Sequence, residues 1–508
     1  MKKYILLSLC AGIAATMQAQ DSFDTYTFAN SDLNGTARYV GMGGAIGALG
    51  GDVSVMGSNP AGTAMYRSND AAITLSGQFT GEGVMGHDAA RMSLDQGGIL
   101  LAFDMNAPTS KGLQFVNFGF NFVKKRNFLS NQATNVMNLN NTFSQTFQIA
   151  DMCNDAWDND FYGTLADLSA ATDKRPGLLN ERDIDIVDVN GNPVLDEDGN
   201  KTFYRQYEGV AARSAYYERA TFGANTQADL NLSFNISDQF FLGASLGVYN
   251  MDYTRESFYK EVGIDNNVYD LTNWYKTHGD GFDVKFGFIV RPIEDSPFRI
   301  GFTAHTPTWY RLIDSNGATL NFHESYIDYK ENGEYEYRFH TPWKLGVSLG
   351  HTIGKSFAFG AEYEYQDFST NSYSVWRGQD RDYFRNQNSI TKQTFRAQHT
   401  LKVGFEYKPI EEFSVRLGYN FVSSPFKNNA YRTIGYDGVY TETDYTIWGA
   451  THRFTCGFGY RFKGGYFDLA YQYQGQKGDF YAFDDIDFKS TKIDNIRHQV
   501  MGTLGFRF

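Results

Sequence analysis

The sequence has little cysteine and proline, and it has no long apolar run beyond its N-terminus. Of 508 residues, three are cysteine and ten are proline. Cys153 falls in a long polar connection and Cys456 on an apolar strand face, so neither a disulfide framework nor a cysteine-ligated metal is indicated. The nine histidines lack the spacing of a zinc-binding helix, and no local signature joins a nucleophile to a base. We expect no metal, no cofactor and no enzymatic activity.

The first residues have the pattern of a secretory signal peptide. Lys2 and Lys3 precede an apolar run, and Ala19 supplies a small residue before the expected cut. We therefore expect residues 1–19 to be removed, which changes the formal net charge from -13 to -15 because this segment carries two lysines and no acid. An acidic surface of this size argues against a nucleic-acid partner. After residue 19, no window reaches the roughly 18 to 20 apolar residues of a membrane-spanning helix.

Aromatic residues are abundant, with 34 Tyr and 43 Phe, and in many segments every second residue is apolar. Because side chains alternate between the faces of a strand, each such segment has one apolar and one polar face. The clearest segment is 219–236, where apolar residues interleave with Asn, Gln, Asp and Ser. Fourteen segments follow this pattern: 71–80, 97–105, 112–123, 219–236, 240–258, 279–290, 298–312, 343–352, 356–369, 397–407, 413–423, 451–462, 466–475 and 498–508.

Short and long connections alternate between these segments. The six short ones, such as 237–239 and 353–355, all lie on one side, and every connection on the other side is longer. The chain ends on alternating aromatics at Phe506 and Phe508, which is typical of outer-membrane barrels. We predict an all-β fold, a transmembrane antiparallel β-barrel of about 14 strands over residues 71–508, in the outer membrane of a Gram-negative bacterium. Its inward charges, among them Lys285, Glu406 and Arg416, are expected to pair across the lumen.

The longest connection, 124–218, is too long for a bare loop. Its first half has the pattern of short amphipathic helices over the barrel mouth. Its second half carries two hairpin-turn signals, Asn190-Gly191 and Asp198-Gly199. The acidic residues around them resemble calcium loops, but Pro193 stands where a glycine is needed and the closing Glu is absent, so exposed turns are favoured.

Residues 20–70 are rich in glycine and alanine, which would weaken a free helix but suit a segment packed tightly inside another structure. We expect this segment to form a hatch, with short helices, that plugs the lumen.

Several blocks resemble the FadL family of outer-membrane transporters of long-chain fatty acids and aromatic hydrocarbons, with which TodX is grouped. They are Asn34-Gly35-Thr36-Ala37-Arg38, Gly41-Met42-Gly43-Gly44-Ala45, Asn59-Pro60-Ala61-Gly62, His305-Thr306-Pro307 and Thr341-Pro342-Trp343. The resemblance covers nearly the whole chain after residue 19, with 124–218 as the main departure. It implies a fourteen-stranded barrel with an internal hatch, a greasy pocket, and a sideways exit beside a distorted third strand.

The resemblance also points to site residues. As hatch or gate residues it implies Asn59, Pro60, Ala61, Gly43 and Gly44, although the Asn-Pro-Ala element also fits a plain structural turn. Candidates for the lateral opening are Asn117, Phe118, Gly119 and Phe120 on the third strand. Gly119 fits either a bulge or a small inward residue of a crowded barrel.

The expected function is diffusion-driven uptake of small hydrophobic molecules, fatty-acid-like or aromatic, through a hatch-gated lumen and a lateral opening. One alternative is a partner-binding barrel subunit of a larger secretion or assembly complex, with 124–218 as the docking surface. Another is a passive porin or a haem-binding surface protein, although a lumen filled by a hatch argues against an open porin. Expected partners are a small hydrophobic ligand and the lipid and lipopolysaccharide of the outer membrane.

Overall fold

The computed structural model describes residues 21–105, 111–159, 165, 178–196, 198–293, 295–322, 325–376, 384–432 and 441–508. The expected signal peptide, residues 1–19, lies outside the described residues. Among the described residues, no helix combines the length and the hydrophobicity needed to cross a lipid bilayer.

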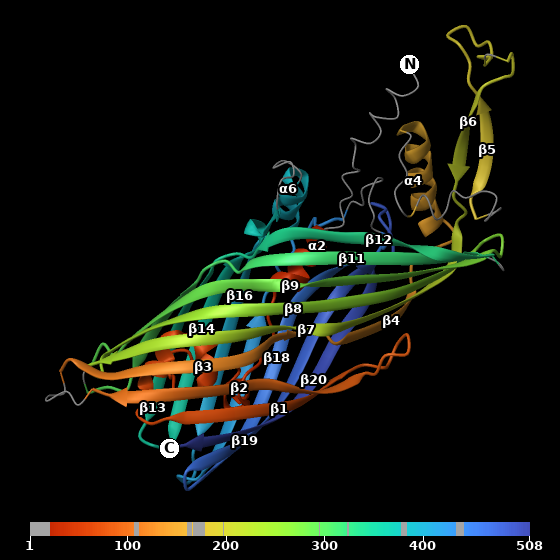
Figure 1. The fold of residues 1–508 in the computed structure, drawn as a ribbon. Coiled ribbons are helices and arrows are strands. Elements are labelled where there is room, and N and C mark those ends of the chain that lie inside the picture. Colours follow the sequence, from red (N-terminus) through yellow and green to blue (C-terminus); the bar gives the residue numbers. More distant parts are fainter. Residues whose placement is uncertain are drawn as a thin grey trace.

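The chain forms one closed antiparallel barrel of fourteen strands, which confirms the predicted fold (Figure 1). The barrel closes where β1 pairs with β20, from Asp70↔Arg507 to Thr80↔Arg497. Ten strands are continuous: β1 (Asp70–Thr80), β2 (Ala90–Asp104), β7 (Ala212–Ile236), β8 (Phe240–Gly263), β9 (Val268–Val290), β16 (Ala397–Tyr407), β17 (Phe413–Val422), β18 (Tyr445–Phe462), β19 (Gly465–Tyr481) and β20 (Thr491–Arg507).

The other four strands consist of two segments each. They are β3 (Leu113–Asn127) with β4 (Ser130–Val136), β10 (Arg299–His305) with β11 (Trp309–Phe322), β12 (Ser325–His340) with β13 (Lys344–Ile353), and β14 (Phe357–Asp367) with β15 (Ser372–Val375). The prediction of one strand over 298–312 is therefore wrong in its extent. The observed strand is interrupted after His305, and its second segment continues to Phe322. Likewise, much of the predicted loop 313–342 is the long hairpin of β11 and β12.

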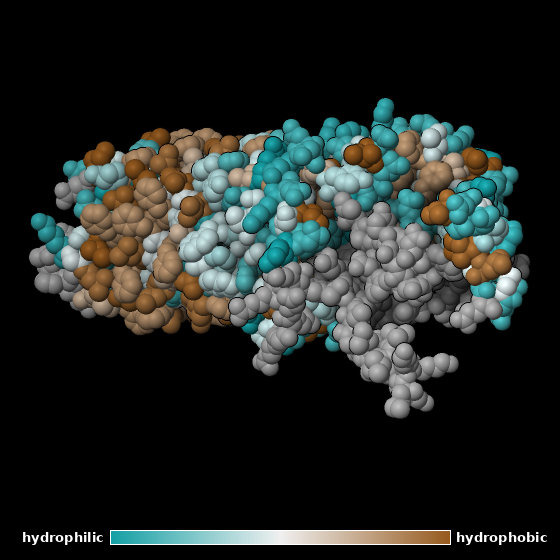
Figure 2. All heavy atoms as spheres, turned by 90° about the horizontal axis from the view of Figure 1, so that it is seen from above, coloured by the Kyte–Doolittle hydropathy of each residue, from teal (hydrophilic) through white to brown (hydrophobic). Residues whose placement is uncertain are grey.

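The two faces of the wall differ as the alternation predicts. On the lower part of β7 every second residue is polar and buried toward the lumen, namely Asn225, Gln227, Asp229, Asn231, Ser233 and Asn235, whereas Leu230 is 58% exposed on the outer face. Figure 2 shows the outward apolar side chains gathered in a band toward the end of the barrel that carries the short turns. Beyond this band the strands continue with polar outward residues. The sequence pattern fades there, so strand ends on the long-loop side were predicted too short.

The hatch lies inside the barrel (Figure 1). It contains four short described helices. They are α2 (Ser22–Ala29), α3 (Ala37–Gly41), η1 (Val53–Gly57) and η2 (Pro60–Met65). Each begins after a residue whose side chain accepts a hydrogen bond from the first turn, namely Asp21, Thr36, Asp52 and Asn59. These caps satisfy amide groups that the helix itself leaves free.

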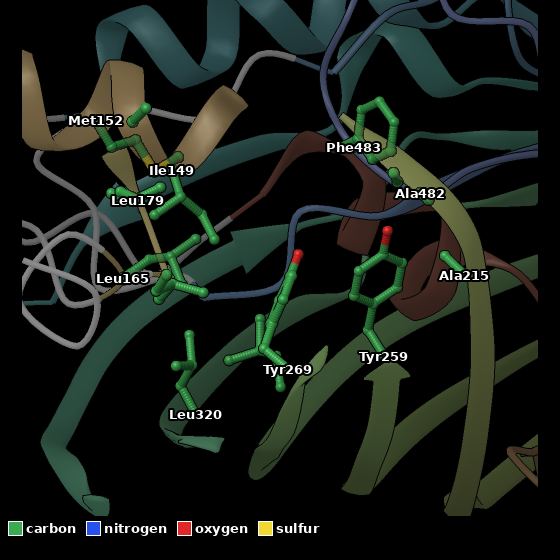
Figure 3. Close-up of a cluster of buried hydrophobic side chains, with 14 of the residues drawn as sticks. Ile149, Met152, Leu165, Leu179, Ala215, Tyr259, Tyr269, Leu320, Ala482 and Phe483 are labelled. Carbon is green, nitrogen blue, oxygen red and sulfur yellow. The ribbon is translucent and has the colours of Figure 1, made fainter. Parts of the chain in front are cut away.

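The predicted insertion contributes one described α-helix, α4 (Gln145–Asn159), and a two-stranded ribbon, β5 (Asn180–Asp185) with β6 (Phe203–Glu208). Ile149, Met152 and Cys153 of α4 belong to one cluster of buried apolar side chains. Figure 3 shows Ile149 and Met152 of this cluster together with Tyr269 and Leu320 from the upper ends of barrel strands. This apolar cluster, which we call the mouth cluster, covers one side of the barrel mouth. The ribbon projects away from the barrel (Figure 1), and its two turns bring Val187 against Pro193 and Leu195 against Lys201, which confirms the predicted hairpin turns.

Among the described residues, the long-loop side also carries the helix α6 (Arg385–Thr394) and the short η3 (Phe368–Thr370).

Candidate functional site

The Asn59-Pro60-Ala61 turn packs against glycines of three neighbouring strands. Asn59 Oδ1 accepts a hydrogen bond from the Ala61 amide at 3.2 Å. A Cβ atom at Gly287 would lie 2.2 Å from Asn59 Oδ1, and one at Gly243 would lie 2.4 Å from the Pro60 carbonyl. The turn therefore sits where only glycine leaves room in the wall.

Gly43 occupies a similar position against the backbone of β16 and β17, whereas Gly44 lies against Leu33 and Tyr39 of the hatch itself. Both have positive φ, 63° and 77°, a conformation that side chains other than glycine rarely adopt. Gly360, Gly404 and Gly418 are direct cross-strand neighbours on β14, β16 and β17, and a Cβ atom at any of them would lie within 2.3 Å of the backbone of residues 42–45. The body of the hatch thus contacts the wall backbone to backbone, and we call these strand positions the glycine rows.

The candidate residues on β3 lie in a closed part of the wall. The register is continuous through Gly119 toward both β2 and β7, so of the two interpretations of Gly119, a bulge or a small inward residue, the bulge is excluded. Gly119 instead leaves space for Met56 of the hatch, whose Cε would lie 2.3 Å from a Cβ atom there. Asn117 points inward and donates to the carbonyls of Thr63 (2.7 Å) and Tyr66 (3.1 Å), whereas Phe118 and Phe120 are exposed on the outer face.

The irregular part of the third strand begins a few residues later. The ladder between β2 and β3 ends at Gln96↔Val123, the register with β7 shifts between Lys124 and Arg126, and the strand is interrupted between Asn127 and Ser130. The predicted strand ends at residue 123 because Lys124-Lys125-Arg126 breaks the alternation of apolar and polar residues. That run of charges was the available signal for the distortion.

Along this segment, backbone groups of β3 that have no partner on β2 form hydrogen bonds with hatch residues. The Asp32 amide donates to the Lys125 carbonyl and Asp32 Oδ2 accepts from the Asn127 amide, both at 2.9 Å. Asn34 Nδ2 donates to the Lys124 carbonyl at 3.0 Å. We call residues 30–34 the hatch strap. Sequence reasoning did not identify it as a site.

The charge of Asp32 is stabilised by arginines. Burial opposes ionisation, but Arg497, Arg126 and Arg453 outweigh it and hold the pKa of the Asp32 carboxyl below its usual range. Arg497 Nη2 lies 2.7 Å from Asp32 Oδ1. The strap is therefore held to the wall by an ion pair as well as by backbone hydrogen bonds.

Two cavities, of about 130 and 120 Å³, lie between the hatch strap and the wall. Their linings are mainly charged and amide side chains, so the greasy pocket implied by the resemblance is not found in these cavities. Most of the charges are paired, as predicted for the lumen: Lys285 bridges Asp229 and Asp283 at 3.0 and 2.6 Å, and Lys402 bridges Glu362 and Glu364 at 2.7 and 2.8 Å.

Lys125 differs from these lysines. Its Nζ lies 4.4 Å from the centre of the Tyr249 ring, and within the part of the chain that is described no carboxylate comes within 4.0 Å of it. The larger cavity thus has an amino group on its wall that can receive an anionic or strongly polar group.

Aromatic rings gather on the long-loop side of the cavities, around α2. Phe28 packs edge-on against Tyr253 at 5.7 Å, and Tyr26 lies 5.2 Å from Phe426. Helix α2 is held in this aromatic cluster by two ion pairs, Asp24 with Arg255 at 2.8 Å and Asp21 with Arg432 at 2.7 Å. The apolar surface that the cavities lack is therefore present beside them, covered by α2.

The sequence matches no protein-family model and no curated protein. Among solved structures, the CymD monoaromatic hydrocarbon channel aligns with a TM-score of 0.50 at 11% identity, covering 94% of this chain and 99% of that chain. A Pseudomonas aeruginosa FadL homologue (TM-score 0.46, 13% identity, 94% and 98%) and the Ralstonia pickettii toluene transporter TbuX (0.48, 11%, 94% and 99%) also align. The CymD alignment shows a shared fold over nearly the full length of both chains.

Proposed function

We propose that this chain, which has the fold of FadL-type outer-membrane barrels, is a channel that takes up small hydrophobic or amphipathic molecules by diffusion. The observation that carries the proposal is the third strand, whose wall partner is replaced by the hatch strap at Lys124–Asn127. A wall segment closed by the hatch instead of by a neighbouring strand can open sideways without breaking a β-ladder.

The lumen is filled by the hatch, which disfavours an open aqueous pore. An apolar solute needs a route that spares it from water, since transfer of apolar surface into water costs roughly 25 cal/mol per Å². The aromatic cluster around α2 supplies such a surface. Movement of α2 requires its two ion pairs to break, together with its hydrogen bonds from Arg126, Tyr373 and Gln476, whereas the body of the hatch stays in the glycine rows.

Polar cavities next to an aromatic cluster suit an amphipathic molecule. Its apolar part would lie among the rings near Phe28, and its polar end would lie in the larger cavity near Lys125. From there, displacement of the strap from β3 opens the side of the barrel. In this proposal the lateral exit lies at residues 124–130 and not at the originally expected residues 117–120.

The test is to fix the strap to the wall. In a Cys153→Ser, Cys456→Ser background, Asp32→Cys and Asn127→Cys are bridged by a short thiol reagent with a cleavable disulfide. Uptake of a radiolabelled aromatic hydrocarbon and of a radiolabelled fatty acid is then measured in cells carrying the variant. We expect the bridged protein to lose most of its uptake and the reduced protein to regain it.

A matched control joins two turns far from the route. Lys355 and Glu411 form an exposed ion pair at 3.5 Å between neighbouring short turns, so Lys355→Cys with Glu411→Cys accepts the same bridge. This control should retain uptake in both states. Equal uptake by the bridged and the reduced Asp32/Asn127 variant, with the bridge verified by mass spectrometry, would refute a lateral exit at the strap.

A second candidate function, docking of a protein partner, is favoured by the ribbon of β5 and β6. A two-stranded ribbon is marginally stable in water by itself, and its edges offer unpaired backbone groups to another chain. Val189 at its turn is fully exposed and Leu195 is 56% exposed. Both properties fit a segment that becomes ordered against a partner.

This candidate is tested by replacing residues 186–202 with Gly-Gly. If the only role of the ribbon is to bind a partner, the shortened protein should still fold as a barrel and take up solute. It should no longer co-purify with a protein that the full-length chain binds in stoichiometric amount. Loss of uptake without loss of a partner would contradict the docking role.

A further inference from the structure

Three matching Tyr–His pairs mark one height on the outer face of the barrel. Each joins a Tyr hydroxyl to a His Nδ1 at 2.8 Å across neighbouring strands. The pairs are Tyr363 with His399, Tyr419 with His452, and Tyr471 with His498. Such rings with a polar tip are typical of the boundary between the acyl chains and the headgroups of a bilayer.

The distance to the other boundary supports this assignment. Each histidine precedes an exposed aromatic near the short-turn end of its own strand by the same interval, from His399 to Tyr407, from His452 to Tyr460 and from His498 to Phe506. That interval of eight residues corresponds to about 27 Å along a strand, which is roughly 19–22 Å of height for strands tilted by about 35–45°. An apolar band of a membrane barrel is about 25 Å tall. The Tyr–His pairs therefore lie at the upper edge of the apolar band.

On β9 and β11 the same edge is formed by Phe282 and Trp309. Phe282 is 51% exposed, and its ring centre lies 5.2 Å from that of Trp309. Arg311 follows two residues after Trp309 on the same face, so it lies just above the apolar band, at the level of lipid headgroups.

Arg311 stands directly opposite a second arginine. The register of β11 and β12 pairs Arg311 with Arg338, and both side chains are exposed. Trp376 lies against both guanidinium groups, with its ring centre 4.7 Å from Arg311 Cζ and 4.6 Å from Arg338 Cζ. Two like charges directly across an antiparallel pair repel each other, so this arrangement calls for an anion.

The neighbouring acids leave part of this charge uncompensated. Glu336 pairs with Arg311, and Asp280 faces Arg311 from β9. Around Arg338, no carboxylate of the described chain lies within 4.0 Å. Arg338 and the outer N–H groups of Arg311 therefore remain available to an additional anionic group.

We propose that Arg311, Arg338 and Trp376 form a binding site for the phosphate of an outer-leaflet lipid headgroup. Guanidinium groups bind phosphate through paired N–H donors, and stacking on an aromatic ring holds them in position. The height of the site just above the apolar band selects a phosphate carried by a membrane lipid over one in solution. The site is independent of the uptake route, since it lies on the outer face of the wall.

The experiment measures lipid binding to the purified barrel by native mass spectrometry, with lipid A, with lipid A whose phosphates have been removed, and with inorganic phosphate as probes. Arg311→Gln with Arg338→Gln should bind lipid A about tenfold or more weakly, since hydrogen bonds to charged groups are worth on the order of one factor of ten each. Glu336→Gln should bind lipid A more tightly than the unmodified chain, because it removes the acid that competes for Arg311.

The matched control is Arg182→Gln with Arg205→Gln, which removes two positive charges from the ribbon, far from the apolar band. It should bind lipid A as the unmodified chain does, and an unchanged heat-resistant band on gels should verify that every variant is folded. The proposal is overturned if the Arg311/Arg338 variant binds lipid A as well as the control does, if lipid A without phosphates binds equally well, or if inorganic phosphate alone occupies the site as tightly as lipid A.

Discussion

At the scale of single residues, the glycines of the wall decide how closely the hatch can approach. Gly350, Gly360, Gly404 and Gly418 are successive cross-strand partners on β13, β14, β16 and β17. Small residues in the hatch meet small residues in the wall, so two backbones come into contact without intervening side chains. The contact is then stabilised by close packing of polar main chains instead of by a greasy core.

This predicts a position-dependent cost of adding one methyl group. A Cβ atom at Gly404 would lie 2.3 Å from the Met42 carbonyl oxygen, whereas one at Gly97 of β2 would meet nothing within 4 Å. Gly404→Ala should lower the free energy of unfolding by about 1–3 kcal/mol, the usual cost of overpacking. Gly97→Ala should change it by much less. Urea unfolding in detergent, followed by tryptophan fluorescence, distinguishes the two, and equal stabilities would contradict the tight contact.

The small residues of the hatch could be predicted from the sequence, but their partners could not. Alternation identifies Gly404 as an inward position without saying which part of the hatch lies opposite. Gly43 and Gly418 are separated by most of the chain, and only the three-dimensional register brings them together. The same holds for Asn117, whose role as an anchor for Thr63 and Tyr66 has no local signal.

At the scale of elements, α4 seals one side of the barrel mouth. The carboxylate of Glu261 on β8 accepts from the Gln145 amide at 3.1 Å and from Ser144 Oγ at 2.5 Å, which fixes the start of the helix on the wall. Cys153, on the buried face of α4, is 0% exposed. Burial raises the pKa of its thiol to about 12, with a smaller contribution from Glu181.

The thiol of Cys153 therefore reports whether the mouth cluster is closed. In a Cys456→Ser background, we expect Cys153 to react with iodoacetamide at pH 8 at least about a hundredfold more slowly than an ordinary exposed cysteine, because the thiolate is the reacting form. Below its raised pKa, each unit of pH should raise the rate about tenfold, whereas an exposed cysteine levels off above its ordinary pKa of about 8.5.

A cysteine placed at exposed Asn140, in a chain lacking the native cysteines, is the control for this measurement. In denaturant the two thiols should react at the same rate. Fast reaction of Cys153 in the folded protein would show that α4 leaves the wall often, which contradicts a closed mouth cluster.

Element boundaries show where the sequence pattern stops being informative. Within the apolar band, the strand positions from alternation agree with the structure, because one face meets lipid. Above the band the outward residues are polar, and on β11 the buried inward positions mix polar Asn316 with apolar Leu320, so the period-2 signal is weaker there. The third strand shows the same limit, since Lys124-Lys125-Arg126 looks like a loop although the strand continues to Asn127.

At the scale of the whole molecule, the strand count, the asymmetry of the connections and the internal hatch could be predicted, since each depends on local periodicity or composition. The polarity of the cavities could not. It depends on which inward charges meet across the lumen, for example Lys402 with Glu362 and Glu364. The resemblance implied an apolar pocket, whereas the apolar surface of this barrel lies under α2, held there by the buried pair of Asp24 and Arg255.

The glycine rows also constrain the order in which the molecule is built. The hatch precedes β1 in the chain, and the wall closes only when β20, the last strand, pairs with β1. A folded hatch could enter a closed barrel only by passing the wall at van der Waals distance, because its backbone fits against glycines on several strands at once. A hatch already in place when β20 pairs with β1 meets no such obstacle, and the number of strands in the wall then has to match the size of the hatch.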